Sequence, residues 1–172
     1  MTETKYVIIP VGFHAVQCQS LLMPLLPPSY EWMNHFDFVK QYLYGADVSP
    51  LEVWLMVWDV PTTGKSADVH PQPSEAAIIY NGLLVNLLWC KQQGRGIRVN
   101  VLHILPVTMK PGCSEPPVKA MFPTAVDSIH SIDLQKQHEN ADPDMLVGEF
   151  IRKANEQAAA VIRKAHHHSI TQ

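Results

Sequence analysis

Three short apolar runs along the chain have the pattern of buried β-strands. Residues 5–11 are rich in β-branched side chains, residues 52–60 are apolar on both faces, and residues 97–107 alternate at first and then become continuously apolar. Strands that are apolar on both faces are typical of parallel sheets covered by helices on both sides. We therefore expect three buried, mainly parallel strands.

Helical spacing separates these runs. A short helix is expected over residues 13–23, where a proline stops it. An amphipathic helix is expected to begin after Ser29 as its N-cap and to end at Gly45, because apolar residues follow Ser29 at helical intervals. A third helix is expected to begin at Ser74 and to end at Gly94, and it is apolar nearly all round. A helix of that kind is either wholly buried or packed against a partner.

The composition changes after the third run. Residues 110–142 contain four prolines and more acidic than basic residues. This pattern predicts an irregular arm, in which residues 128–138 could form a helix and from which an edge strand could join the sheet. An Ala-rich helix is then expected from Pro143 to about residue 165. Its apolar residues repeat at the four-three spacing of a seam between helices, and the seam is formed by Val147, Ile151, Ala154, Ala158 and Val161.

The order of these elements predicts the fold class. We expect an α/β protein with a small, mainly parallel sheet of three or four strands flanked by helices, followed by a Pro-rich arm and a long C-terminal helix. A length of 172 residues fits one domain with an extension. The expected division is an α/β core over residues 1–109, an arm over 110–142, and an amphipathic helix with a short tail over 143–172.

Composition excludes several classes of protein. Only 17% of the residues are charged, against roughly 25% in ordinary soluble domains. With a net charge of −3, this excludes a disordered chain, a coiled-coil rod and a polybasic nucleic-acid binder. Residues 6–30 carry no formal charge, but their four internal prolines prevent a continuous membrane-spanning helix. Three widely spaced cysteines without a CxxC pair favour a reducing compartment, so we expect a cytoplasmic protein.

Two patterns resemble known ligand sites without having their chemistry. The segment from Thr63 to Ser66 reads TGKS, as in a phosphate-binding loop, but Asp59 occupies the position of that loop's first glycine. A carboxylate there would repel phosphate. The consecutive histidines 166–168 point about 100° apart on a helix, so three of them cannot meet one ion. We expect no metal and no cofactor.

An enzyme is nevertheless one possible interpretation. In open α/β sheets, ligands bind beyond the carboxyl ends of the strands. Several polar residues are expected at or near those ends. An acid–base pair could come from His14, Asp59 and His103, and a ligand could be held by Thr62, Thr63 and Lys65. Each of these residue types also occurs at strand ends for structural reasons.

The residue usage favours a protein that acts by contact. Four Trp, five Tyr and seven Met beside few charges are typical of interfaces, although cores use similar residues. We therefore expect a non-enzymatic interaction module, such as a regulator, inhibitor or assembly component, that engages a second copy or another protein through its apolar helix seam or arm. The alternatives are a small-molecule-binding α/β enzyme and, third, a nucleic-acid-binding regulator that uses the basic residues of the C-terminal helix.

Overall fold

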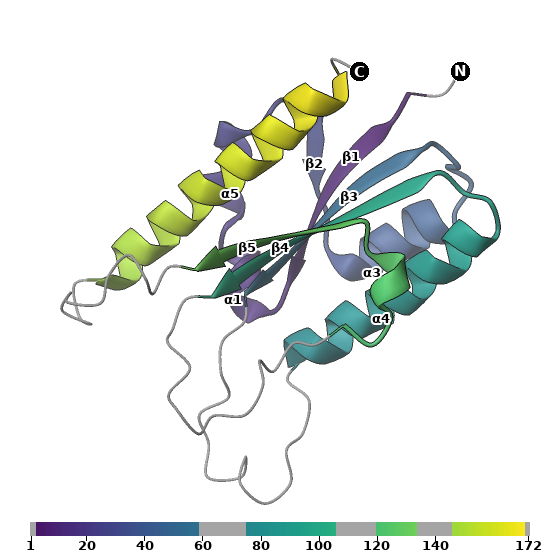
Figure 1. Cartoon of the computed structure of the whole chain (residues 1–172), viewed down its shortest axis with the longest axis horizontal. Helices are drawn as coiled ribbons and strands as arrows, with labels where there is room; N and C mark the ends of the chain where they lie inside the picture. The colour runs from purple at the N-terminus through teal and green to yellow at the C-terminus, as the bar shows by residue number, and fades with distance from the viewer. Residues whose placement is uncertain (1–2, 59–74, 106–119, 134–145, 171–172) are drawn as a thin grey trace, which may run out of the picture.

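A computed structural model describes residues 3–58, 75–105, 120–133 and 146–170. Within these residues, five strands form one sheet in the order β2-β1-β3-β4-β5, and every neighbouring pair is parallel (Figure 1). The strands are β1 (Lys5–Val11), β2 (Tyr30–Trp32), β3 (Leu51–Trp58), β4 (Ile97–Leu105) and β5 (Ser128–Asp133). The order reverses direction at β1, as in doubly wound α/β proteins.

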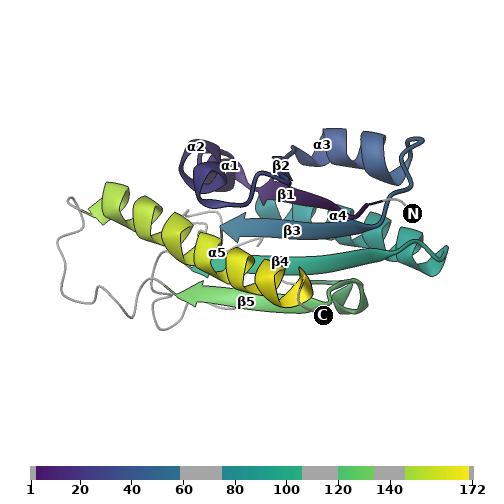
Figure 2. The ribbon, with the colours of Figure 1, turned by 90° about the horizontal axis from the view of Figure 1, so that it is seen from above.

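Helices cover both faces of this sheet. One face carries α3 (His35–Phe38), the π-helix η2 (Val39–Leu43), α4 (Glu75–Gln92) and the short 3-10 helix η4 (Pro123–Ala125). The other face carries α1 (Phe13–Val16), α2 (Gln19–Leu22), η1 (Met23–Leu25) and α5 (Leu146–Ile170). Figure 2 shows α5 lying along the sheet on the face opposite α3 and α4. The expected α/β class is confirmed, with five strands instead of three or four.

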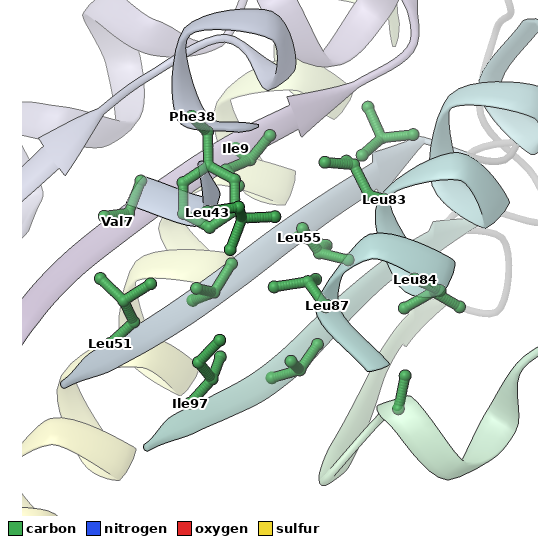
Figure 3. Close-up of a cluster of buried hydrophobic side chains, with 14 of the residues drawn as sticks. Val7, Ile9, Phe38, Leu43, Leu51, Leu55, Leu83, Leu84, Leu87 and Ile97 are labelled. Carbon is green, nitrogen blue, oxygen red and sulfur yellow. The ribbon is translucent and has the colours of Figure 1, made fainter. Parts of the chain in front are cut away.

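The core consists of two apolar layers, one on each side of the sheet. Side chains of successive strand residues point to opposite faces, so Val7 and Leu55 lie beneath α3 and α4, whereas Ile8 and Trp54 face the opposite layer. Figure 3 shows the first layer, in which Leu87 of α4 packs over the strands. All eight residues of β3 are buried, Glu52 among them, which explains why the run is apolar on both faces.

The helix expected after Ser29 begins later than predicted. Residues 30–32 form the edge strand β2, paired with β1 in the register Tyr6↔Tyr30 and Ile8↔Trp32. The helix starts only after Asn34, whose side-chain oxygen accepts the N–H of Asp37 at 2.8 Å. The prediction was wrong because Tyr-Glu-Trp alternates with a period of two, and the two aromatic residues satisfy a strand as well as a helix.

The segment expected to be an arm also contains regular structure. A helix over residues 128–138 was predicted, but residues 128–133 form β5, the outer strand next to β4. The alternative of an added edge strand is therefore confirmed. Asp127 fixes its start: its N–H donates to the carbonyl of Val99 at 2.8 Å, and its carboxylate accepts the N–H of Val99 at 2.7 Å. Two bonds to one residue of β4 set the strand register.

Candidate contact surface on helix α4

The seam of the C-terminal helix lies inside the fold. Ala154 and Ala158 are fully buried, and Ile151 and Val161 pack beside them against α2 and the sheet. Val147 lies on the same helix, in its first turn, where the structure does not describe the side chain. The described part of the seam thus packs on α2 and on the chain's own sheet.

The predicted strand-end residues are described only in part. Asp59, Thr62, Thr63 and Lys65 lie outside the described residues, and of His14 only the backbone is described, in α1 directly after β1. His103 lies in β4 between Val57 and Ser131, half-buried, and by strand alternation it faces the α4 side of the sheet. The acid–base pair therefore stays a prediction.

A cavity opens at a different pair of strand ends. It has a volume of about 570 Å³ and is lined by residues at the ends of β1 and β2 and by residues of α2, α3 and η2. Its polar lining includes Glu31, Asn34, Asp37 and Lys40, and Trp32 supplies an aromatic wall. The hydroxyl of Tyr42 donates to the Glu31 carboxylate at 3.0 Å. Sequence reasoning did not single out these residues.

The two described cysteines and His166 are engaged inside the fold. Within the part of the chain that the structure describes, no group of three or more His, Cys, Asp or Glu side chains is gathered as a metal site would require. Burial raises the pKa of both Cys18 and Cys90, which keeps them in the less reactive thiol form. His166 is occupied within the fold, because its Nδ1 lies 3.1 Å from the hydroxyl of Tyr30.

The outer side of α4 is unusually apolar. Ile78, Val85 and Trp89 are 61%, 42% and 53% exposed, and Gly82 is exposed between them. These four residues follow each other at intervals of four, three and four, so they form one line along the helix, which we call the α4 stripe. The helix has no Asp, Glu, Lys, Arg or His from residue 76 to residue 90. Exposed apolar residues gathered on one face, unlike scattered ones, mark contact surfaces.

The polar residues beside the α4 stripe are bonded within the fold. The Asn81 amide donates to the carbonyl of Ala77 at 3.0 Å and accepts the N–H of Met121 at 2.8 Å. The Asn86 amide donates to the carbonyl of Gly82 at 2.8 Å and accepts the hydroxyl of Tyr44. Because these amide groups already have partners, covering them would cost little desolvation energy.

Tyr44 extends the apolar surface beyond the helix. Its ring centroid lies 6.5 Å from that of Trp89, and 61% of its surface is exposed. Lys91, the basic residue in the last turn of α4, is held away by an ion pair with Asp127 at 2.7 Å. The stripe therefore ends in two adjacent aromatic side chains, Tyr44 at the C-cap of η2 and Trp89 of α4.

The described part of the chain gives no steric reason for a glycine at position 82. A Cβ atom added to Gly82 would meet no described residue within 4 Å. Glycine inside a helix costs roughly 0.5–1 kcal/mol relative to alanine, so the residue weakens α4 without relieving any contact in the monomer. A close approach by something outside the chain would make use of the missing side chain.

The residue pattern of α4 indicates this surface in the sequence. A helix that is apolar all round must be buried or partnered, and only one side of α4 packs on the sheet. The four-three spacing of the C-terminal helix is also present at residues 78, 82, 85 and 89. The sequence does not single out these four residues, because the inward-facing residues of α4 are equally apolar.

Comparison of the chain with protein-family models, with curated proteins and with solved structures finds no match. Among the described residues, no helix combines the length and hydropathy needed to cross a membrane.

Proposed function

We propose that this protein is a non-enzymatic interaction module that binds a protein partner through the α4 stripe and the adjoining ring of Tyr44. The observation that carries the proposal is the exposure of Ile78, Val85 and Trp89 on a helix face without ionisable residues. The proposed place of action is the reducing cytoplasm, in keeping with two buried thiols, Cys18 and Cys90.

The chemistry of the stripe suits a contact that excludes water. Fully burying a large apolar side chain contributes about 1.5–3 kcal/mol, and Trp and Tyr are enriched among the residues that dominate binding energy. Trp89 and Tyr44 lie together at one end of the stripe. We expect them to be the main anchors, with Ile78 and Val85 completing the apolar contact.

Site-specific photocrosslinking tests this function. A benzoylphenylalanine residue at Val85 should form protein adducts, either in the purified protein or in an extract of the native host. Val48, which is 73% exposed outside the stripe, is the matched control position and should form few adducts. Absence of adducts from Val85 in both preparations, or equal yields from the two positions, would contradict the proposal.

The cavity beside β2 supports a second candidate function, which is binding of a small ligand. Ligand sites commonly measure about 300–1,000 Å³ and combine apolar walls with a few polar groups, as here. Glu31 and Asp37 outnumber Lys40 in the lining, so a ligand with a positively charged group is favoured. Titration with small amines should change the fluorescence of Trp32 in a saturable way, with Trp32→Phe as the control for the other tryptophans. Glu31→Gln should weaken this binding. A response that survives Trp32→Phe or Glu31→Gln unchanged would place binding elsewhere.

A further inference from the structure

We propose that the partner on the α4 stripe is a second copy of this chain, with the two α4 helices antiparallel about a twofold axis between Gly82 and Val85. The proposal rests on the proposed function and names its partner. It follows from the spacing, the size and the charge of the residues on the stripe, which are taken in turn below.

The spacing of the stripe is symmetric along the helix. Ile78 and Trp89 lie equally far from the midpoint between Gly82 and Val85. A twofold axis through that midpoint therefore places Ile78 of one copy opposite Trp89 of the other, and Gly82 opposite Val85. In a twofold interface each contact occurs twice with the roles exchanged, so one surface has to be complementary to itself. The α4 stripe meets this condition with all four of its residues.

Side-chain size is complementary in the same arrangement. A Cβ atom at Gly82 would have no neighbour within 4 Å among the described residues, so the missing side chain leaves room for Val85 of the second copy. The bulky ring of Trp89 lies opposite the smaller Ile78, and Tyr44 supports that ring from the side. A parallel pairing would instead place Gly82 against Gly82 and leave a gap, while it forces the two Trp89 rings together.

Charge favours the same partner. The helix has no Asp, Glu, Lys, Arg or His from residue 76 to residue 90, and the amides of Asn81 and Asn86 are bonded within the chain. A surface without charge is matched by another surface without charge, since an unpaired ionic group would lose its hydration there. A second copy supplies such a surface automatically.

The size of the contact sets the expected strength. An 18-residue helix is about 27 Å long, and helix pairs pack about 8–10 Å apart. Interfaces of standard size cover about 800 Å² on each partner, which is more than one helix face provides even with Tyr44 added. The dimer should therefore be weak and depend on protein concentration.

Mixed disulfide trapping tests the antiparallel register. Two single variants, Gly82→Cys and Val85→Cys, carry different affinity tags and are oxidised separately and together. At about 8–10 Å between helix axes, facing Cα atoms come within the roughly 4.4–6.8 Å that a disulfide spans. The 82–85 product between the two variants should exceed the 82–82 and 85–85 products at least fivefold. The unsubstituted chain controls for its own three cysteines.

Sedimentation equilibrium provides the second measurement. Ile78→Glu and Gly82→Leu should each weaken association at least tenfold, whereas Ile129→Glu, at a 59% exposed isoleucine of β5, should leave it unchanged. Gly82→Leu should also raise the melting temperature of the monomer, because leucine is the better helix former. A loss of association with a gain in monomer stability cannot be explained by unfolding.

The outcomes separate this inference from the proposed function. A purified chain that is monomeric at all concentrations, yet forms adducts from Val85 in host extract, would overturn the second copy and leave the interaction module standing. Predominant 82–82 and 85–85 products would also overturn the proposed pairing. Absence of adducts in both preparations would overturn the function and this inference together.

Discussion

The hydroxyl of Tyr30 lies 3.1 Å from Nδ1 of His166, although 136 residues separate them in the chain. The ring of Tyr6 stacks on that of Tyr30 at a centroid distance of 5.0 Å and meets the edge of His166 at 4.9 Å. These three rings join the first two strands of the chain to the last turns of α5. The helix is therefore held at both its alanine seam and its C-terminal end.

Removal of this contact should loosen α5. Tyr30→Phe keeps the ring and loses one hydrogen bond, so we expect a decrease of about 0.5–1.5 kcal/mol in the free energy of unfolding. His166→Ala removes the hydrogen bond and also two ring contacts, those with Tyr6 and Tyr30. It should therefore lower the free energy of unfolding more than Tyr30→Phe does, by up to about 1.5 kcal/mol for each ring contact. Urea denaturation measures both. Arg163→Ala, an exposed change on the same helix, is the control and should stay within about 0.5 kcal/mol of the original protein.

Asp127 should be the most sensitive charged residue near β5. Its carboxylate accepts the N–H of Val99 and the ammonium of Lys91, both at 2.7 Å. Asp127→Ala leaves the N–H of Val99 without this acceptor, and a buried unsatisfied donor costs about 1–3 kcal/mol. Lys91→Met removes the ion pair and the bond from the ammonium to the carbonyl of Ala125 at 3.3 Å, but it leaves the bond between Asp127 and Val99 in place. The ion pair is partly exposed and should contribute about 0–1 kcal/mol. Equal losses in the two variants would show that the bond to Val99 does not anchor the strand.

One substitution should have opposite effects at two glycines. Gly12 has φ +98°, a conformation that side chains rarely adopt, and an added Cβ would lie 3.2 Å from that of Ala76. Gly12→Ala should therefore destabilise the fold by about 1–3 kcal/mol. Gly82→Ala fills open space on a helix and should stabilise the monomer by roughly 0.5–1 kcal/mol. Thermal unfolding at low protein concentration measures both. If both substitutions raise or both lower the melting temperature, the different roles given to Gly12 and Gly82 are wrong.

The sequence predicted those elements whose pattern had one interpretation. Residues 5–11 match β1 without error, and Gly94, with φ +90°, ends α4 as expected. The prediction failed where two patterns overlap. Trp32 fits a helix by its spacing to later apolar residues, but residues 30–32 pair with β1 and form a strand. Residues 128–133 have too few apolar residues to indicate a strand. Instead, the hydrogen bonds of Asp127 to Val99 place them beside β4.

The candidate surface was harder to predict for a physical reason. A seam at four-three spacing was predicted in α5 and not in α4, because α5 carries many charged and polar residues between its apolar ones, whereas α4 has only Asn81 and Asn86 among its apolar residues. In α5 the seam faces the sheet, as the burial of Ala154 and Ala158 demonstrates. In α4 the inward side and the outward side are both apolar, so only the position of the sheet distinguishes a core residue such as Leu87 from an exposed one such as Val85.

Alkaline pH should reveal the buried tyrosines. Burial raises the pKa of Tyr80 to about 12, and burial together with the hydrogen bond to Glu31 raises the pKa of Tyr42 to about 12. The ordinary pKa in the unfolded chain is about 10. Because the folded state binds these protons more tightly, the stability they contribute is fully present below pH 10 and is lost as the pH rises from about 10 to about 12. Tyrosinate absorbance should therefore develop late in the native protein.

Variants at the two positions separate the causes of this titration. Tyr42→Phe and Tyr80→Phe should each remove one late-titrating group and reduce the loss of stability between about pH 10 and pH 12. Glu31→Gln should lower the pKa of Tyr42 toward its ordinary value, because it removes the charge beside the phenol, and should leave Tyr80 unaffected. If Tyr42→Phe instead removes absorbance that develops near pH 10, the phenol of Tyr42 is open to solvent, and its hydrogen bond with Glu31 is not maintained in solution.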